Sequence, residues 1–485
     1  MHFDRFDPAR EVISDPCYFD SWTSRAELLS TLKAGRTFDV VVLGATFEGV
    51  ALAHIAALCG MRTLLVELDD FQTNRYRFTV DSFYPPIETG GVGKIFRNFG
   101  RKRKVDRFIE SHQHLTTFAS NSLKSSQGFF SSGAFLIDSL VAAQREGACV
   151  VNYIRLVSYS YDKNQALELQ LVDTLSDNKF NLRAGVVYNT QATQYGNYGR
   201  VTVAPWTTSL ALQPVEDLFI PDYFVDRCSL FNLGSSRLAT LVRPYCAGAQ
   251  VSFYHPVCSI KNQADHQLGD HLDELVRVLE IPESSLSGRF SYTNYQPVYK
   301  QAIFESLFQP RYWKVSGGLI YLINSNLPDI YQIALSGLNL AFKIAGRPRQ
   351  EELLEPPCLP ASFAYENSIA EFKKAAHLVG VPVWYIERAI ERFGSRVRYL
   401  LGKQEYLEIV EGICLKGELL LAVVAEQAVT LRDLLHGRLG FSVAVAEELT
   451  TSAKLKAALS ELDLLDRMLP LKEDLNDPGV SIKQS

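Results

Sequence analysis

Several features that would point directly to a function are missing from this sequence. Its eight cysteines are scattered, and no two stand in the C-x-x-C spacing of zinc or redox motifs. No apolar run approaches the roughly 20 residues that span a bilayer. The first ten residues include Asp4, Asp7 and Pro8 and lack the apolar core of a signal peptide. We therefore expect a cytoplasmic protein without a metal site, at most peripheral to a membrane.

An excess of either charge is also absent. The chain carries 49 Lys and Arg against 54 Asp and Glu, a net charge of -5. A dedicated nucleic-acid binder is usually basic over a whole face, so nucleic acid is not an expected partner. The chain is, however, long and rich in hydrophobic residues. Its 485 residues are 47% hydrophobic, which favours two or three domains with substantial cores.

The N-terminal part has the pattern of one βαβ unit. Residues 37–43 (TFDVVVL) form a continuous apolar run, typical of a strand buried on both faces of a parallel sheet. Residues 44–49 predict a turn, 50–59 a helix ended by Gly60, and 61–66 a second buried strand. Strand, tight turn, helix and strand follow within about 30 residues, the length of a βαβ unit.

The turn of this unit carries an altered dinucleotide-binding fingerprint. Gly44 and Gly49 occupy the first and third glycine positions of G-x-G-x-x-G, but Thr46 stands at the second, where the backbone approaches a pyrophosphate. Glu48 adds negative charge to the same turn. Glu67 stands where an acid would bind the ribose. The pattern predicts a dinucleotide-binding fold, and it leaves open whether the unit binds a nucleotide or survives as a scaffold.

The remaining chain divides into a β-rich middle and a helical end. Helices are expected at 135–146 and 330–344, strands at 149–161, 166–174 and 186–189, and antiparallel β structure in the middle third. Further helices are expected at 367–379, 382–393, 404–412, 415–436 and 442–468. The expected domains are a leader helix within 1–36, a dinucleotide-binding domain over 37–350 with a β-rich cap at about 205–310, and a helical domain over 351–485.

With these segments in place, the sequence resembles the FAD-dependent glycerol-3-phosphate dehydrogenases of the aerobic or respiratory type. Residues 25–71 resemble the family's leader helix and its "fDvlViGGGxtG" strand and turn, and 183–192 (RAGVVYNTQA) its "RARVVVNATG". Two C-terminal segments also match, 388–402 (RAIERFGSRVRYLLG) and 417–440. In the second, the residues in register are Glu418, Glu426, Ala428, Thr430, Asp433, Leu435 and Arg438.

The resemblance implies an α/β, FAD/NAD(P)-binding Rossmann-like domain, an antiparallel β cap and a C-terminal all-α domain. Family enzymes oxidise the secondary hydroxyl of sn-glycerol 3-phosphate to a ketone and pass hydride to the flavin, whose chemistry the protein orients. Carried over position by position, the FAD-binding residues are Gly44, Thr46, Gly49, Glu67, Gly90 and Gly91.

The positions that would serve the substrate and flavin depart from the family pattern. The family's histidine and its following arginine fall on Thr89 and Gly93, and a substrate-binding arginine falls on Gln296. The glycine of the family's "NATG" turn is Ala192, and its "GGKLTTYR" segment loses its glycines, with Asn326 at the second position. An amide cannot replace a guanidinium as a phosphate clamp, because it carries no charge. No catalytic residue can be assigned.

Two hypotheses follow. The chain is either a divergent FAD-dependent oxidoreductase, impaired in or altered from glycerol 3-phosphate oxidation, or a flavin-free, non-catalytic homologue that acts in binding, assembly or regulation. The first takes a small phosphorylated or hydroxyl substrate. For the second, the basic run Lys94–Arg107 offers a contact for a protein partner or a membrane surface, although such a run is more often a solvated helix face.

Overall fold

The computed structural model describes residues 23–71, 80–82, 116–118, 128–161, 167–190, 201–212, 229–232, 239–245, 248–254, 290–299, 312–322, 329–344, 359–360, 365–441 and 443–469. For 80–82, 116–118, 128–132, 161, 316, 443–445 and the described strands between 201 and 299, the description covers the backbone alone.

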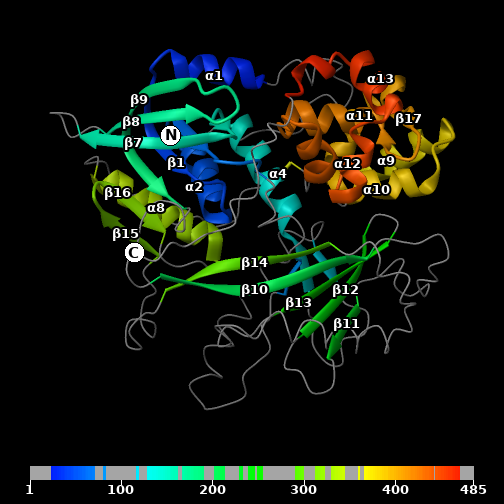
Figure 1. The fold of residues 1–485 in the computed structure, drawn as a ribbon, viewed down its shortest axis with the longest axis horizontal. Helices are drawn as coiled ribbons and strands as arrows, with labels where there is room; N and C mark the ends of the chain where they lie inside the picture. Colours follow the sequence, from blue (N-terminus) through cyan, green and yellow to red (C-terminus); the bar gives the residue numbers. More distant parts are fainter. Residues whose placement is uncertain are drawn as a thin grey trace.

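A mixed sheet of eight strands forms the centre of the α/β region (Figure 1). Its strands run in the order β15-β16-β9-β1-β2-β6, and the hairpin β7–β8 joins it through β9. Strand β1 pairs in parallel with β2 and β9. The bounds are β1 Thr37–Leu43, β2 Thr63–Val66, β6 Cys149–Val151, β7 Ile154–Tyr161, β8 Leu167–Asp173, β9 Lys179–Asn189, β15 Trp313–Ser316 and β16 Leu319–Leu322.

Side chains of β1 alternate between two cores. Val40 and Val42 point into a core shared with helices α2, α4 and α8, whereas Val41 and Leu43 point into a core shared with α1 and the β7–β8 hairpin. Both faces of β1 are therefore buried from residue 40 onward, which explains why residues 40–43 are all apolar. The helices are α1 Arg25–Lys33, α2 Phe47–Leu58, α4 Ser132–Arg145 and α8 Ile330–Ile344.

Antiparallel strands form the cap expected in the middle of the chain. Five strands run in the order β11-β12-β13-β10-β14, and three short ones in the order β3-β5-β4. Figure 1 shows the five-stranded sheet below the α/β region and the helical region. The bounds are β3 Val80–Ser82, β4 Thr116–Phe118, β5 Gly128–Ser131, β10 Val201–Leu212, β11 Ser229–Asn232, β12 Ala239–Tyr245, β13 Gly248–Tyr254 and β14 Phe290–Tyr299.

The C-terminal region is helical and packs beside the α/β region (Figure 1). Two of its segments, η8 and η9, are π-helical, a rare geometry that often marks functional positions. The elements are α9 Tyr365–Leu378, α10 Val383–Phe393, η6 Gly394–Leu401, η7 Gln404–Leu407, β17 Ile409–Val410, β18 Cys414–Leu415, α11 Lys416–Leu420, η8 Leu421–Ala425, η9 Asp433–Arg438, α12 Val443–Leu449, α13 Ala453–Glu461 and η10 Leu465–Arg467.

Four expectations about single elements are wrong. The helix expected over 442–468 is three separate segments, α12, α13 and η10. The strand over 149–161 is two strands, because Tyr153 adopts a left-handed backbone with φ 58° between β6 and β7. Residues 404–412 form η7 and the hairpin strand β17 instead of a helix. The helix over 415–436 is broken, since Gln427 also has a positive φ, 52°.

The fold class is the expected one: a Rossmann-like α/β region, an antiparallel β cap and C-terminal helices. Among the described residues, no helix is long and apolar enough to cross a membrane, and no group of three or more potential ligands gathers for a metal.

Candidate dinucleotide-binding site

The turn after β1 uses both of its glycines. Gly44 has φ 106°, a conformation that L side chains rarely adopt, and its N–H donates to the Val66 carbonyl at 2.8 Å. A Cβ on Gly49 would lie 2.4 Å from the Gly44 oxygen and 2.8 Å from Thr190 Oγ1. The first and third positions of the fingerprint are therefore needed for the turn itself, whether or not a ligand binds.

Thr46 closes the N-terminus of α2 with its own side chain. It is the N-cap residue, and its Oγ1 accepts a hydrogen bond from the Gly49 N–H at 3.1 Å. Helix N-termini bind phosphates through such free N–H groups and through the positive end of the helix dipole. Glu48, only 3% exposed, places a carboxylate in the same first turn. The Thr46 hydroxyl therefore accepts a hydrogen bond that a ligand phosphate would otherwise accept.

Glu67, the predicted ribose-binding acid, joins the turn to the end of β2. Its Oε2 accepts from the Ala45 N–H at 2.7 Å, and its Oε1 accepts from the Leu68 N–H at 2.8 Å. The side chain is buried. The structure thus brings Gly44, Thr46, Gly49 and Glu67 together as the fingerprint predicts, with the carboxylate already engaged by backbone donors.

Sequence reasoning missed Thr190, which covers the same turn from the end of β9. Its Oγ1 lies 2.9 Å from the Gly44 oxygen and 3.1 Å from the Leu43 oxygen, within donor reach of both. Its N–H donates to the Leu43 carbonyl at 3.0 Å. The signal that could have found it is a hydroxyl directly after a buried strand, which must lie at the same sheet edge as the turn after β1.

Several predicted positions lie outside the described residues. These are Thr89, Gly90, Gly91, Gly93, Ala192, Asn326 and the basic run Lys94–Arg107. Gln296 lies in β14, of which the backbone alone is described. Tyr331, the residue on which the tyrosine of the family's "GGKLTTYR" segment falls, is buried in α8 and packs edge-on against Phe135, with 6.5 Å between ring centroids. It belongs to the core.

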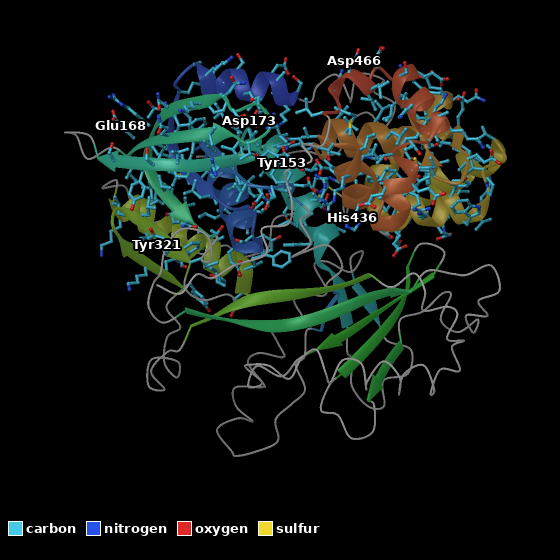
Figure 2. All side chains as sticks on the ribbon, in the orientation of Figure 1. Tyr153, Glu168, Asp173, Tyr321, His436 and Asp466 are labelled. Carbon is cyan, nitrogen blue, oxygen red and sulfur yellow. The ribbon has the colours of Figure 1, made fainter. Side chains whose placement is uncertain are left out.

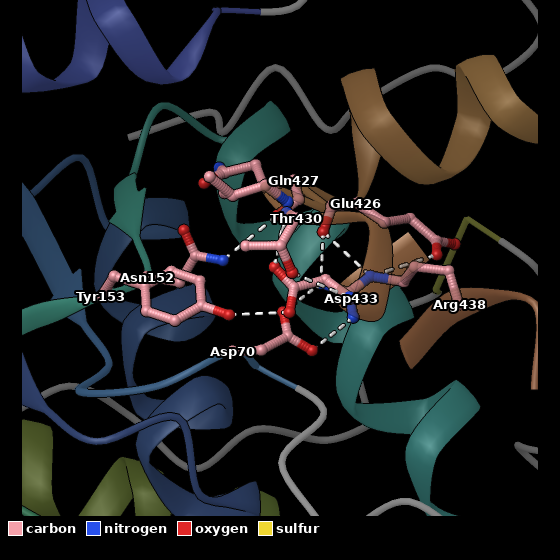
Figure 3. A network of polar contacts seen from close by, with 9 residues as sticks. Asp70, Asn152, Tyr153, Glu426, Gln427, Thr430, Asp433 and Arg438 are labelled. Atoms are coloured by element: carbon pink, nitrogen blue, oxygen red, sulfur yellow. Dashed lines mark hydrogen bonds and ion pairs between the residues drawn. The ribbon is translucent and has the colours of Figure 1, made fainter. Parts of the chain in front are cut away.

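A buried polar network joins the α/β region to the helical region (Figure 3). Arg438 donates from Nη1 and Nη2 to the two oxygens of Asp70, at 2.8 and 2.7 Å. Asp70 stands three residues beyond Glu67 in the loop after β2. The same guanidinium donates to the Glu426 carbonyl oxygen. The C-terminal region thereby holds the loop that begins at the predicted ribose-binding acid.

Thr430 and Asp433 form a reciprocal cap in this network. The Asp433 carboxylate accepts from the Thr430 N–H at 2.9 Å, and the Thr430 hydroxyl accepts from the Asp433 N–H at 3.1 Å. From the α/β side, the Tyr153 hydroxyl donates to Asp433 at 2.7 Å. Figure 2 shows Tyr153 at the boundary between the two regions. The residues in register with the resembling family thus cap a helical segment and meet the α/β region.

The second half of the network uses one fully buried arginine and two amides. Arg396 lies 2.7 Å from Glu426 and 3.3 Å from Asp138 in α4. Gln427 Nε2 donates to the Val150 carbonyl at 2.8 Å, and Asn152 Nδ2 donates to the Gln427 carbonyl at 3.1 Å. One bond uses the Gln427 side chain and the other its backbone carbonyl. The break in the helical segment at Gln427 therefore lies where the helical region contacts the α/β region.

Burial shifts the pKa of two residues in the network, Asp433 and Tyr153, and of one histidine in α2. Burial and the nearby Asp70 carboxylate raise the pKa of Asp433 to about 6. Burial also raises the pKa of Tyr153 well above its ordinary value, so the phenol stays protonated and remains a donor. In α2, burial lowers the pKa of His54 to about 4. His54 is therefore a neutral histidine of the core.

FAD is the group that this fold implies, and the turn does not fit its pyrophosphate as it stands. The Thr46 Cβ and hydroxyl lie where the fingerprint requires a bare backbone, and the Gly49 N–H is already satisfied. The scaffold for a dinucleotide is present, and one N–H of its anion-binding part is already bonded to the Thr46 side chain.

The combination of a βαβ turn on a mostly parallel sheet, an antiparallel cap and C-terminal helices defines the Rossmann-like class of FAD-binding oxidoreductase folds. Within that class, the chain is similar to the glycerol-3-phosphate dehydrogenase from Bacillus halodurans solved in complex with FAD. The TM-score is 0.60 and the identity 16%, over 92% of this chain and 98% of that chain. A likeness at this identity establishes the fold, and the fold that the sequence resemblance implied is confirmed.

Weaker structural likenesses are to NikD, an unusual amino acid oxidase essential for nikkomycin biosynthesis (TM-score 0.41, 12% identity, 66% of this chain and 99% of that chain), and to a flavoprotein/dehydrogenase from Cytophaga hutchinsonii (TM-score 0.38, 11% identity, 86% and 99%). No protein-family model and no curated protein matches the sequence.

Proposed function

We propose that this chain is a divergent FAD-dependent oxidoreductase of the glycerol-3-phosphate dehydrogenase type in which oxidation of sn-glycerol 3-phosphate is impaired or altered. The observation that carries the proposal is the assembled βαβ turn, which brings Gly44, Gly49 and Glu67 together. The hydrogen bond from the Gly49 N–H to Thr46 Oγ1 supports the impaired or altered activity, because it satisfies the turn from within. The neutral Gln296, where the resembling family has a substrate-binding arginine, supports it from the substrate side.

The proposal includes a substrate class and a location. A small molecule that carries a hydroxyl or phosphoryl group remains the substrate class, and the cytoplasm the expected location, with any membrane contact peripheral. Cell fractionation of the untagged protein tests the location. Turnover of sn-glycerol 3-phosphate with an artificial electron acceptor tests the chemistry, and a rate like that of an ordinary flavin-loaded dehydrogenase would refute the proposal.

The alternative is a flavin-free homologue that acts in binding, assembly or regulation. The Thr46 cap favours this alternative, because its hydroxyl accepts a hydrogen bond that a pyrophosphate oxygen would otherwise accept. The two candidates differ in colour: the first predicts a purified protein with a flavin absorption band near 450 nm, at roughly one flavin per chain, and the second a colourless protein that stays folded.

Three substitutions at Thr46 separate the possible causes of weak flavin binding. Thr46→Ser keeps the cap and removes a methyl, Thr46→Ala keeps the Cβ and removes the cap, and Thr46→Gly removes both. If the Cβ blocks the pyrophosphate, then Gly alone gains flavin on refolding with FAD. If the cap blocks it, Ala gains as well. Tight FAD binding by the unaltered chain would show that the steric argument is wrong.

A further inference from the structure

The buried apolar cores of the α/β region and of the helical region are separate. The two apolar clusters of the α/β region consist of residues between 28 and 359, and the two of the helical region consist of residues between 369 and 468. No cluster of described residues draws members from both regions. Either core can therefore stay intact if the two regions move apart.

The two regions meet through polar contacts, and we call this boundary the joint. Figure 3 shows its centre. Polar interfaces between domains of one chain permit relative motion. The buried ion pairs among the contacts add little net stability, because desolvation of the charges offsets their attraction. The contacts are Asp70 with Arg438, Tyr153 with Asp433, Asp138 with Arg396, Arg145 with Tyr399, and Asn152 and Val150 with Gln427.

Two residues of the joint hold an unfavourable backbone conformation. Among the described residues, those other than glycine with a positive φ are Tyr153, Gln427, Asp177 and Asp463. Aspartate tolerates this conformation, whereas it is uncommon for residues as large as tyrosine and glutamine. Tyr153 (φ 58°) and Gln427 (φ 52°) face each other across the joint and are linked by Asn152, which precedes Tyr153 and donates to the Gln427 carbonyl. Backbone strain is therefore concentrated where the two regions meet.

The joint also leaves buried acceptors without a protein donor. Asn152 and Gln427 are buried, and the side-chain nitrogen of each donates across the joint. Their side-chain oxygens, Asn152 Oδ1 and Gln427 Oε1, accept from none of the described residues. A buried acceptor in this state is destabilising, and it gains hydrogen bonds from water when the two regions separate. The strain and these acceptors both lower the free energy that separation requires.

We propose that the helical region opens from the α/β region as a rigid body, and that the polar contacts of the joint hold the closed state. In the open state Arg438 leaves Asp70, which stands three residues beyond Glu67 in the loop after β2. The loop that begins at the predicted ribose-binding acid then loses its contact with the helical region. Opening thereby acts on the loop beside the dinucleotide turn, and it is independent of which of the two functions above is correct.

The test measures the distance between the two regions in the full chain. Spin labels are attached to ketone amino acids introduced at position 157 in β7 and position 378 in α9, so that the native cysteines stay unmodified. The side chains at both positions are exposed, Val157 to 51% and Leu378 to 79%. Pulsed electron–electron double resonance should show two distances, a major one for the closed state and a minor, longer one for the open state.

Two matched tyrosine variants test the role of the joint. Tyr153→Phe should raise the open fraction at least threefold, because it removes the hydroxyl that donates to Asp433 across the joint at 2.7 Å. Tyr188→Phe is the control. It also removes a buried tyrosine hydroxyl, but the bond of this hydroxyl to the Gly337 carbonyl, at 2.6 Å, lies within the α/β region. That loss affects the open and closed states alike, so the open fraction should stay unchanged.

Hydrogen exchange gives a second readout that needs no label. The Leu68 and Asp69 N–H groups donate to the Glu67 carboxylate in the loop that Arg438 holds through Asp70. A peptide that contains residues 67–71 should exchange at least threefold faster in Tyr153→Phe than in the unaltered chain, and at an unchanged rate in Tyr188→Phe. If Tyr153→Phe does not fold, Asn152→Ala replaces it, because it removes the donor to the Gln427 carbonyl.

Three results would overturn the proposal. The first is a single distance between the labels in the unaltered chain and in the joint variant. The second is an equal rise of the open fraction in the joint variant and in Tyr188→Phe. The third is a loss of the closed distance that is accompanied by a loss of helical circular dichroism, because the regions would then unfold instead of separating. A second distance that depends on protein concentration would indicate association of two copies and would also overturn it.

Discussion

The dinucleotide turn and the polar network between the two regions have diverged differently. At the turn, Gly44 and Gly49, which the backbone needs, are present, while Thr46 replaces the glycine that would face a ligand. In the network, the family-like residues Asp433 and Arg438 bond to partners within this chain. Residues that the architecture needs are thus present in both places, and at the turn the position that would face a pyrophosphate is not a glycine.

The largest expected effect tests the network. Arg438→Met should lower the free energy of unfolding by about 3–5 kcal/mol, because it leaves the Asp70 carboxylate buried without its cation. Urea unfolding followed by circular dichroism measures it. The control is Arg62→Met, whose ion pair with Asp39 is exposed and contributes at most about 1 kcal/mol. Equal losses in both variants would contradict the architectural role of the network.

The two regions should respond to pH in opposite directions. The pKa of His54, in the helix of the turn, is lowered to about 4. Stability from His54 is therefore complete above pH 6.5 and is lost as pH falls toward 4, by about 1.4 kcal/mol per unit. The pKa of Asp433 is raised to about 6. Its contribution is complete below about pH 4 and is lost as pH rises through 6.

Single substitutions separate these two responses. His54→Gln should flatten the loss of stability between pH 6.5 and 4, and Asp433→Asn should steepen it, because it removes the opposing contribution. The measurement is the urea midpoint as a function of pH for the three chains. Parallel pH profiles for all three would show that neither group titrates with folding.

Gly49→Ala tests how tightly the turn is built. The added Cβ meets the backbone oxygen of Gly44 at 2.4 Å, so the turn must shift, at a cost of about 2 kcal/mol. Gly185→Ala is the graded control, since its Cβ would lie 3.0 Å from the Asp39 oxygen and needs a smaller adjustment. Thermal unfolding compares them, and a smaller loss at Gly49 than at Gly185 would be inconsistent with the close packing.

The smallest effect belongs to the cap. Thr46→Ala should cost about 1 kcal/mol by removing the acceptor for the Gly49 N–H, and Thr46→Ser should be nearly neutral. If Thr46→Ala is neutral in stability, then Thr46 does not cap α2 in solution, and the closed form of the turn loses its main support.

The sequence predicted those elements well whose local apolar pattern alone decides the secondary structure. The strand at 37–43 and the helix at 330–344 have the predicted bounds. The helix after the turn begins at Phe47 instead of residue 50, because the side chain of Thr46 caps it. The long helix predicted over 415–436 fails at Gln427, whose backbone is fixed by bonds to Val150 and Asn152, far away in the sequence.

The same limit applies to the candidate site. Gly44, Thr46, Gly49 and Glu67 could be predicted because they belong to one short motif with a known spacing. Thr190 reaches the turn from the end of β9, and Asp70 meets a partner 368 positions away. Contacts of that kind depend on the order of strands in the sheet and on the docking of the helices, which local patterns do not specify.

Asp70 connects the loop after β2 to the C-terminal helical region through its ion pair with Arg438. Glu67 and Asp70 lie in one short loop, and Arg438, from the C-terminal helical region, donates hydrogen bonds to Asp70 in that loop. We expect that displacing the Glu67 carboxylate from the Ala45 N–H would disturb the ion pair between Asp70 and Arg438, because both acids lie in this loop. A spectroscopic label placed beside Arg438 would therefore report on a change in the contacts of Glu67, in the turn region of the α/β sheet.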